Sequence, residues 1–374
     1  MLSKKMFGFG NKRFIGIDIG TSNIKIVELK VSGNRPVLTN YAWVHIHDFM
    51  VGGDLKSAYF DTILPEYIKR MFAESKMTGR EANFSIPAFG GLITLIEFPD
   101  MKKEDLDQAI KFEAHKYIPV SLEDVVLSWD IVSRKSVSKL IDRGEILAEN
   151  KNRIPENKSN DKIGVLLVAA PKNKVIKYEK LAKDANLELK SIEIESFSMV
   201  RALVGNDQGN FVIVDIGSRV CNIILVEKGV IKANRNIDAG GKDISRVIAK
   251  SMSVSDEKAI VLKISGKNFL NGESNLSFPV IDLIIGEISR VLNSYYKEKA
   301  DMAIDGIILS GGTAGLSGIS EYFSKALNIK TTIGNPLGRI EYDKRIEPKV
   351  KEIGNQFSVA IGLALNGVDE YLRK

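Results

Sequence analysis

The chain has 374 residues, of which 44% are hydrophobic and 27% charged, a composition typical of a folded globular protein and not of a disordered or fibrous one. Its length predicts two or three domains. The formal net charge of +6, from 53 basic and 47 acidic residues, is small and spread along the chain. This charge therefore predicts neither a nucleic-acid nor a membrane partner.

The single cysteine and the three histidines limit the disulfide and metal chemistry of the chain. Cys221 has no partner for an intrachain disulfide, and its apolar neighbours predict a buried, unreactive thiol. His45, His47 and His115 lack metal-ligand spacing, so we interpret them as structural or solvent-facing. We find neither a secretory signal nor the stretch of about 18 apolar residues needed to span a membrane, and we expect a cytoplasmic protein.

The first predicted elements are two strands joined by a turn. Phe14–Ile17 and Ile24–Leu29 are apolar and β-prone, whereas Asp18–Asn23, with the sequence Asp-Ile-Gly-Thr-Ser-Asn, has turn chemistry. A further strand is expected after the turn at Asn34-Arg35-Pro36.

A helix is predicted from Lys102 to Tyr117, ending before Pro119. Its apolar residues recur with the period of one helical face. Three of them lie four residues apart and two widen the face: Leu106, Ile110 and Ala114, with Ala109 and Phe112.

The composition changes from Ser133 to Lys162, where the second half is almost wholly polar. We interpret this segment as a surface loop forming a long hairpin connection, and its role stays open. The pattern that follows predicts a buried strand, a helix, a strand ending at Glu195 and another helix. The buried strand spans Ile163–Ala170, the first helix spans Asn173–Ala185 and the second helix spans Phe197–Val204.

The opening pattern returns half a chain later. Phe14-Ile-Gly-Ile-Asp-Ile-Gly-Thr-Ser is matched by Phe211-Val-Ile-Val-Asp-Ile-Gly-Ser-Arg, 197 residues further on. Each copy has an apolar strand, Asp-Ile-Gly, a hydroxyl residue and another apolar strand. The simplest architecture is two similar α/β halves, each contributing one hairpin to a shared cleft.

The residues of the two turns fit phosphate and a hydrated metal ion. Gly20 and Gly217 allow tight turns that present backbone N–H groups. Asp18 and Asp215 cannot donate to phosphate when ionised, and they suit Mg²⁺ bound through its water molecules. The further donors are Thr21, Ser22, Asn23, Ser218 and Lys25, the last on the strand after the first turn.

Two more glycine pairs follow predicted strands and precede predicted helices. Gly311 and Gly312, in Ser310–Leu316, would let a flat ring lie against the backbone. Gly240 and Gly241, in Ile237–Asp243, would place helix N–H groups toward phosphate.

These four elements, in this order, resemble the actin, Hsp70 and sugar-kinase superfamily. The resemblance implies that Asp18–Lys25 and Asp215–Asn222 are the phosphate loops of an ATP site. It also implies that Glu195 orients the attacking water. The adenosine-binding residues would be Gly311, Gly312, Thr313 and Leu316, with Glu287 and Arg290 on the preceding helix.

Over nearly the whole chain the sequence resembles the PilM family of actin-like proteins of type IV pilus assembly. The motifs that carry this resemblance are the Phe14–Ser22 strand and turn, Met101–Leu106, Ile110–Pro119, Leu166–Lys172, Ile194–Phe197, Gly286–Arg290, Asn335–Leu337 and Val359–Ala364. The fold implied is α/β, an actin-like (ribonuclease H-like) fold of two similar halves around a nucleotide cleft, with a small subdomain of the FtsA/PilM type (SHS2).

The resemblance also implies subdomain boundaries. Subdomain 1A would comprise residues 1–86 and 187–207, with the small subdomain 1C inserted at residues 87–186. Subdomain 2A would comprise residues 208–240 and 305–350, with 2B inserted at residues 241–304. Residues 351–374 would form a C-terminal helix that packs on 1A.

The function implied is that of a cytoplasmic ATP-binding adaptor, peripheral at the inner membrane. It would bind the cytoplasmic N-terminal peptide of a bitopic, PilN-like protein and couple the pilus motor complex to the periplasmic alignment complex. Relatives carry hydroxyl residues where this chain has Val220 and Cys221, so we expect slow hydrolysis of ATP with Mg²⁺. Self-association stays open.

Two other functions of the same superfamily fit the sequence less well. An FtsA-like division protein would carry a C-terminal amphipathic membrane helix after a linker, which we do not find after Val368. A small-molecule kinase would need a general base in an acceptor pocket, and no motif for one is recognised. A basic stripe with interleaved aromatic residues, typical of nucleic-acid binding, is also not found.

Overall fold

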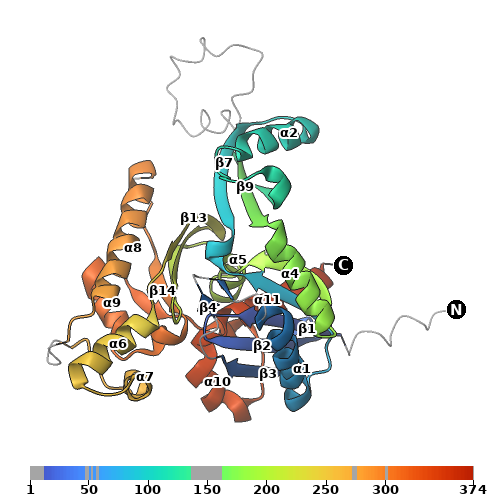
Figure 1. Ribbon diagram of the computed structural model, residues 1–374. Coiled ribbons are helices and arrows are strands. Elements are labelled where there is room, and N and C mark those ends of the chain that lie inside the picture. Colours follow the sequence, from blue (N-terminus) through green and yellow to red (C-terminus); the bar gives the residue numbers. More distant parts are fainter. Residues whose placement is uncertain are drawn as a thin grey trace. The chain divides into compact units, whose positions relative to one another are not determined.

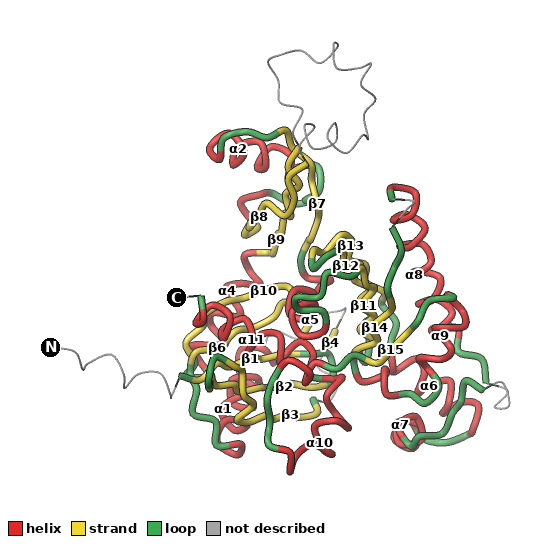
Figure 2. The backbone as a smooth tube through the Cα atoms, turned by 180° about the vertical axis from the view of Figure 1, so that it is seen from behind, coloured by secondary structure: helices red, strands yellow, loops and turns green. Residues whose placement is uncertain are grey.

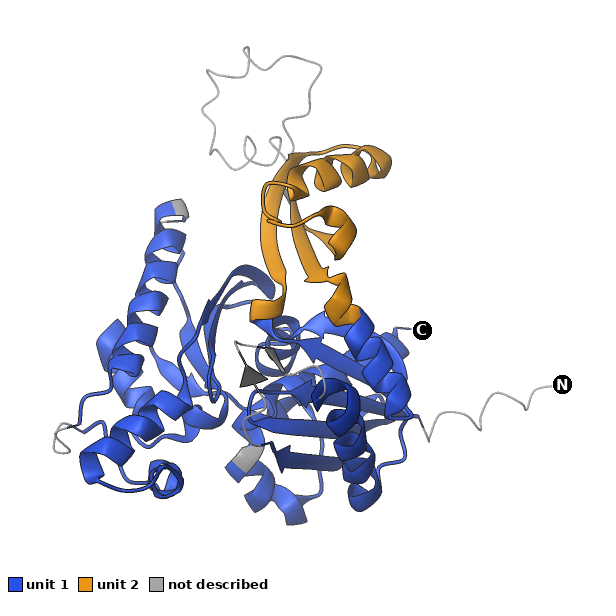
Figure 3. Cartoon of the chain, viewed as in Figure 1, with its two compact units in different colours: residues 1–88, 176–374 blue, residues 89–175 orange. Residues whose placement is uncertain are grey.

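The computed structural model describes residues 12–46, 50–51, 54–55, 59–135, 162–271, 276–299 and 302–373. The chain forms two compact units, a larger one of residues 1–88 and 176–374 and a smaller one of residues 89–175 (Figure 3). The smaller unit lies within the range 87–186 expected for the inserted subdomain. The division of the larger unit into 1A, 2A and 2B stays a prediction.

The first sheet of the larger unit has five strands in the order β10-β6-β1-β2-β3. Figure 1 labels β1, β2 and β3, and Figure 2 also labels β6 and β10. β1, β2 and β3 form an antiparallel meander, and β6 and β10 extend the sheet as parallel strands. The strand–turn–strand predicted from the sequence is therefore confirmed. The strands are β1 (Arg13–Ile19), β2 (Asn23–Ser32), β3 (Arg35–His45), β6 (Glu81–Ile86) and β10 (Glu188–Ile194).

The second sheet repeats this topology, as the sequence repeat predicted. Its order is β13-β12-β11-β14-β15, with a meander of β11, β12 and β13 extended by two parallel strands (Figure 2). The registers also correspond, because Asp18 pairs with Lys25 and Asp215 pairs with Asn222. The strands are β11 (Asn210–Ile216), β12 (Cys221–Glu227), β13 (Val230–Ile237), β14 (Gly306–Ser310) and β15 (Thr331–Ile333).

Helices cover both sheets of the larger unit. α11 packs on β1 and on α5, and its apolar residues join a core with Phe14 and Leu29. The second sheet has its own core, which includes Cys221, fully buried as predicted. The helices are α1 (Leu64–Ser75), α5 (Glu195–Leu203), α6 (Gly241–Met252), α7 (Asp256–Ile264), α8 (Pro279–Glu298), α9 (Ile319–Leu327), α10 (Glu347–Ile353) and α11 (Ser358–Leu372).

Short elements complete the larger unit. β4 (Met50–Val51) and β5 (Asp54–Leu55) form a two-residue ladder, and a π-helical turn spans Tyr59–Ile63. Turns of 3₁₀ helix occur at Ala88–Gly90, Gly312–Gly315, Pro336–Arg339, Lys344–Ile346 and Gly354–Gln356. Within the described ranges, no helix combines the length and apolar character needed to cross a membrane.

The smaller unit is a three-stranded antiparallel sheet in the order β7-β9-β8 with one packed helix. Alternate residues of β9, from Ile163 to Ala169, form a core with Leu106, Ile110 and Ala114 of α2. The elements are β7 (Leu92–Pro99), α2 (Lys103–Ala114), a 3₁₀ turn (Leu122–Asp124), β8 (Val125–Lys135), β9 (Lys162–Pro171) and α4 (Lys172–Asp184), which continues into the larger unit.

Two predictions about the smaller unit have different outcomes. β8 and β9 pair from Lys135 opposite Lys162, which confirms a hairpin connection, and residues 136–161 lie outside the described residues. The prediction that Phe112 widens the apolar face of the helix is wrong, because its side chain is 74% exposed. Phe112 follows the buried Ile110 by two residues, or about 200°, and so lies on the opposite face.

Two helical glycines with different surroundings test this packing. A Cβ on Gly362 in α11 would lie 2.0 Å from the carbonyl oxygen of Ser198 in α5, whereas a Cβ on Gly286 in α8 would meet nothing within 4 Å. We expect Gly362→Ala to lower the free energy of unfolding by at least about 2 kcal/mol through overpacking. Gly286→Ala should raise it by roughly 0.5–1 kcal/mol.

Urea denaturation of both variants, without added nucleotide, measures the two effects. Equal stability of Gly362→Ala and the unaltered chain would show that α5 and α11 are not held this closely.

Candidate functional site

The two Asp-Ile-Gly turns have the same backbone geometry. The N–H of Gly20 donates to the carbonyl of Asn23 at 2.9 Å, and the N–H of Gly217 donates to the carbonyl of Val220 at 3.0 Å. A Cβ would approach these acceptor carbonyl oxygens to 3.1 Å at Gly20 and 2.8 Å at Gly217, which explains why both positions are glycine.

Each turn also presents N–H groups that have no internal acceptor. No residue described in the structure accepts a hydrogen bond from the N–H of Thr21 or Ser22 in the first turn. The same holds for the backbone N–H groups of Ser218 and Arg219 in the second turn, whereas the Arg219 side chain donates to Asp238 at 3.2 Å. Unsatisfied backbone N–H groups at a tight turn form a concave donor surface that suits an anion.

Four ionisable side chains from separate elements come together beside the turns. Lys25 on β2 contacts Asp18 on β1, with 3.0 Å between Nζ and Oδ2. Burial acts to lower the pKa of Lys25, but the carboxylates, Asp18 first and then Asp215 and Glu195, outweigh it and raise the pKa. Lys25 is therefore held as a cation between carboxylates from both halves of the larger unit.

Glu195 is the first residue of α5, one position after the end of β10, and it accepts a hydrogen bond from the N–H of Ala88 at 2.9 Å. Burial raises the pKa of Glu195 to about 8, assisted by Asp215 and Asp18 and opposed by the Ala88 N–H and Lys25. Burial also raises the pKa of Asp215, against the effect of Lys25. Enclosure of several carboxylates with one lysine thus favours a neutral Glu195 near pH 7.

The Gly311–Gly312 segment is held by a neighbouring asparagine. The N–H of Gly311 donates to the carbonyl of Asn355 at 3.0 Å, and the Asn355 amide donates to the carbonyl of Gly311 at 3.1 Å. Gly311 has φ +85° and a Cβ there would lie 2.6 Å from the carbonyl oxygen of Ile216, so only glycine fits. The expected helix does not follow directly, because a 3₁₀ turn intervenes before α9.

The N-terminus of α6 is closed by the second turn. The N–H groups of Gly241 and Lys242 donate to the carbonyls of Gly217 and Ser218 at 2.9 and 2.8 Å. These two donors were expected to face phosphate, but they instead join the Gly240–Gly241 pair to the turn. The carbonyl of Gly241 accepts from Lys263 Nζ at 3.0 Å.

The remaining expected residues have varied positions. Glu287 and Arg290 pair with each other on α8. Thr313 and Leu316 are buried beside the Gly311 turn. Cys221 belongs to the core of the second sheet rather than to the surface of the turn. His45 lies near Asn23, with 3.1 Å between Nδ1 and Oδ1, and His47 is outside the described residues.

Three residues of this region were missed from the sequence. Asn222 was included in the second predicted phosphate loop but without a role; it occupies the position equivalent to Lys25, and its amide donates to Ser196 Oγ at 3.3 Å across the two halves. The 197-residue offset would have identified it. Lys263, whose pKa is lowered to about 8 by burial, and Tyr178, whose pKa is raised by burial near Glu195, gave no signal beyond helical periodicity.

Residues 16–368 match the protein family described as Type IV pilus assembly protein PilM. The chain belongs to the PilM family. It is therefore an actin-like protein of type IV pilus assembly, and the family predicted from the sequence motifs is confirmed.

Solved structures with the same fold include relatives inside and outside pilus assembly. A PilM–PilN type IV pilus biogenesis complex superposes with a TM-score of 0.76 at 24% identity, covering 95% of this chain and 98% of that chain. The ethanolamine utilization protein EutJ of Carboxydothermus hydrogenoformans gives 0.54 at 17% identity, covering 95% and 90%. MreB5 of Spiroplasma citri bound to AMPPNP gives 0.50 at 12% identity, covering 97% and 98%. The actin-like α/β fold predicted from the sequence is confirmed.

The raised pKa of Glu195 gives a pH-dependent stability. Between its ordinary pKa of 4.5 and about 8 the folded chain binds more protons at this site than the unfolded chain, so the stability that it contributes falls as pH rises through this range. Glu195→Gln removes this titration while keeping the shape of the side chain. We expect the Tm of the variant, relative to the unaltered protein, to rise progressively from pH 5 to pH 8.5.

Thermal denaturation in buffers free of nucleotide and divalent cations measures this difference. A difference that stays constant over the range would show that Glu195 is already ionised at pH 5.

Proposed function

We propose that this PilM family member is an ATP-binding adaptor that couples a cytoplasmic pilus motor to a membrane partner. The observation that supports ATP binding most directly is that each turn has backbone N–H groups without an acceptor among the described residues, beside the cluster of Asp18, Lys25, Asp215 and Glu195. Donors for phosphate and carboxylates for a hydrated cation are thus available at one place.

Each residue of the cluster has a distinct role in this proposal. The N–H groups of Thr21, Ser22 and Ser218 bind phosphate oxygens, and Lys25 balances the phosphate charge. Asp18 and Asp215 hold Mg²⁺ through its water molecules, and the ion neutralises part of the triphosphate charge. Among the described residues, no three His, Cys, Asp or Glu side chains could ligate a metal directly. The carboxylates therefore suit a hydrated ion.

We propose that hydrolysis is slow. Glu195 can take a proton from an attacking water only when it is ionised, and burial raises its pKa to about 8. Cys221 no longer supports this proposal, because its side chain is fully buried in the core. Slow hydrolysis is therefore attributed to Glu195 and to Val220.

ATP binding is tested with two variants that act on different parts of the site. Asp18→Asn removes the carboxylate that contacts Lys25, and we expect at least a tenfold weaker Kd for Mg-ATP. Gly312→Arg fills the expected space for adenine. It is preferable to Gly311→Arg, because the atoms nearest to a Cβ on Gly312 belong to the Gln356 side chain, at 3.8 Å, so the fold should tolerate the change. Titration calorimetry gives the Kd values.

Asp184→Asn at the end of α4 is the matched control and should bind Mg-ATP normally. A phosphate-release assay on the unaltered protein should give about one turnover per minute or less, below the usual enzyme range. Undiminished ATP binding by both cleft variants would disprove the assignment of the site.

The partner site is proposed to lie in the smaller unit. Because the sheet order is β7-β9-β8, β7 and β8 each have one edge unpaired within the described sheet. Large apolar side chains are also exposed on this unit. Phe112 is 74% exposed on α2, with Tyr117, Val120 and Val126 exposed nearby in the sequence. An extended peptide can add to such a sheet edge or lie along such an apolar surface.

The proposed partner is the cytoplasmic N-terminal peptide of a bitopic, PilN-like inner-membrane protein. Support comes from the solved PilM–PilN complex that this chain resembles in fold. Such a partner would hold the protein peripherally at the inner membrane and link it to the motor complex. If peptide binding changes the affinity for ATP, then ATP must change the affinity for the peptide by the same factor.

The partner site is tested with the N-terminal cytoplasmic peptide of the single-span protein encoded beside this chain. Fluorescence anisotropy should show saturable binding to the unaltered protein. Phe112→Asp places a charge on the exposed apolar surface and should raise the Kd of the peptide at least tenfold.

Ile264→Asp is the matched control, because Ile264 is also an exposed apolar helical residue, 68% exposed, but lies on α7 of the larger unit. Equal weakening by both substitutions, or no binding to the unaltered protein with or without ATP, would contradict a partner site on the smaller unit.

A further inference from the structure

The smaller unit is joined to the larger one by two connections, one after Ala88 and one before Ile176 (Figure 3). The first connection leads from β6 to β7, and the second leads from β9 into α4. β7 and β9 are antiparallel neighbours in the smaller sheet. Lys174 lies over the ring of Phe89, with 5.5 Å between its Nζ atom and the ring centre. The two connections therefore run beside each other where they enter the smaller unit.

The first connection is bonded directly to Glu195. β6 and β10 are parallel neighbours, and Ile86 at the end of β6 pairs with Ile194, the residue before Glu195. Two residues after Ile86, the N–H of Ala88 donates to Oε1 of Glu195 at 2.9 Å. Ala88 is buried, so bulk water does not compete for this N–H. The chain thus leaves the larger unit from a hydrogen bond to a residue of the candidate ATP site.

The second connection enters the larger unit close to the same carboxyl group. Tyr178 of α4 is buried against Phe60 and Phe84, with ring centres 5.2 and 5.9 Å from its own. Burial raises the pKa of Tyr178, and the nearby charge of Glu195 adds to this effect. The Tyr178 hydroxyl is therefore a neutral group near Glu195, and it is carried by the helix that returns from the smaller unit.

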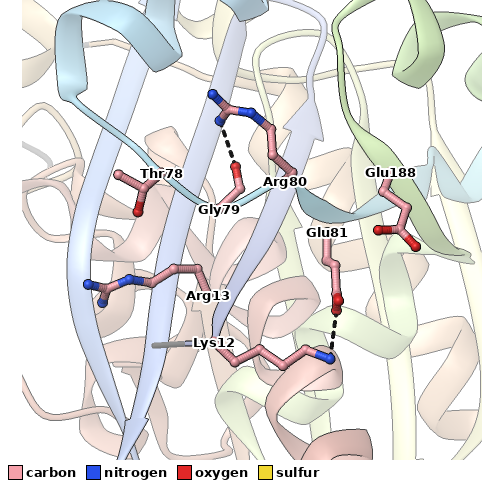
Figure 4. Close-up of a pocket in the computed structure, with 7 residues that line it drawn as sticks. All are labelled: Lys12, Arg13, Thr78, Gly79, Arg80, Glu81 and Glu188. Carbon is pink, nitrogen blue, oxygen red and sulfur yellow. Dashed lines mark hydrogen bonds and ion pairs between the residues drawn. The ribbon is translucent and has the colours of Figure 1, made fainter. Parts of the chain in front are cut away.

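The start of β6 is held at the opposite end of the sheet. Figure 4 shows a pocket there, where Arg13 begins β1 and the turn Thr78–Arg80 leads into β6. Glu81 pairs with Lys12 at 3.1 Å, and the buried carboxylate of Glu28 accepts hydrogen bonds from two N–H groups of the turn, both at 2.8 Å. β6 also pairs with a strand on each side. A shift of the first connection therefore acts on the residues that follow β6 and not on the whole strand.

The hydrogen bond from Ala88 affects both the position and the charge of Glu195. It fixes one of the two carboxyl oxygens, and it lowers the pKa of Glu195 against the stronger effect of burial. Loss of the bond would free the side chain and favour its neutral form further. A nucleotide that contacts Glu195 would thus meet a different group when the first connection is displaced.

We propose that the hydrogen bond from Ala88 to Glu195 couples the partner site on the smaller unit to the ATP site. This inference rests on the proposed function, because it needs a ligand at each site. A peptide that displaces the first connection changes the bond from one side, and a nucleotide that contacts Glu195 changes it from the other. Each ligand then has different affinities for the bonded and the released state, which is the condition for coupling. In this role Glu195 is a positioning residue.

The test measures the Kd of the N-terminal cytoplasmic peptide of the neighbouring single-span protein, with and without the non-hydrolysable ATP analogue Mg-AMPPNP. For the unaltered protein the two Kd values should differ at least about fivefold. Glu195→Ala removes the acceptor of the Ala88 N–H, and the two values should become equal. Glu195→Gln keeps an acceptor oxygen, so the difference should remain although the proton acceptor for hydrolysis is lost. This contrast separates coupling through the hydrogen bond from a purely catalytic role.

A second pair of variants leaves Glu195 and the two turns unchanged. Pro87→Gly adds backbone freedom to the first connection, next to Ala88, and should reduce the ratio of the two Kd values at least about twofold. Pro348→Gly is the matched control. It makes the same exchange at the start of α10 in the larger unit, and it should leave the ratio as in the unaltered protein.

The outcomes distinguish this inference from the proposed function. If the unaltered protein fails to bind the peptide or the analogue, the proposed function itself is wrong. If it binds both, but the peptide Kd is the same with and without the analogue, only the coupling is overturned. Equal loss of the ratio in Glu195→Ala and Glu195→Gln would also overturn it, because the charge of Glu195 and not the hydrogen bond would then carry the effect. An unchanged ratio in Pro87→Gly would show that the first connection does not transmit it.

Discussion

The contact between Lys25 and Asp18 is the interaction on which the centre of the larger unit depends. An enclosed ammonium is tolerated only when carboxylates surround it, and here they come from β1, β11 and α5. The position of Lys25 thus couples the first hairpin to the second half of the unit and to the start of α5. With three acids against one lysine, the cluster favours either a protonated Glu195 or an added cation.

Features determined by local backbone geometry could be predicted from the sequence. The Asp-Ile-Gly repeat predicted two equivalent hairpins, because the glycine N–H must reach the carbonyl three residues later and a side chain would meet that oxygen. The spacing of apolar residues also located α2 and β9 correctly. In α2, for example, Leu106, Ile110 and Ala114 can be buried together only with helical spacing. The same reasoning failed for Phe112, because it was assigned to the apolar face although it follows the buried Ile110 by two residues and so lies on the opposite face.

Features determined by contacts between distant segments could not be predicted. The N–H groups of α6 were expected to face phosphate, but the carbonyls of Gly217 and Ser218 occupy two of them. Similarly, nothing near Arg13 in the sequence indicates that it meets a turn from residues 78–80 and the start of β10. Such relations depend on which strands pair, and the pattern of a single segment does not contain that information.

The two hairpins differ at one register position, where the first carries Lys25 and the second carries Asn222. Two hairpins related by an exact duplication would present nearly equivalent groups, and an elongated anion that contacts both turns could then bind in either direction. Here one copy carries an ammonium ion and the other an uncharged amide at the same register position. The electrostatic potential therefore differs between the two turns, and an anion with unequally charged groups that contacts both of them would have a single preferred orientation.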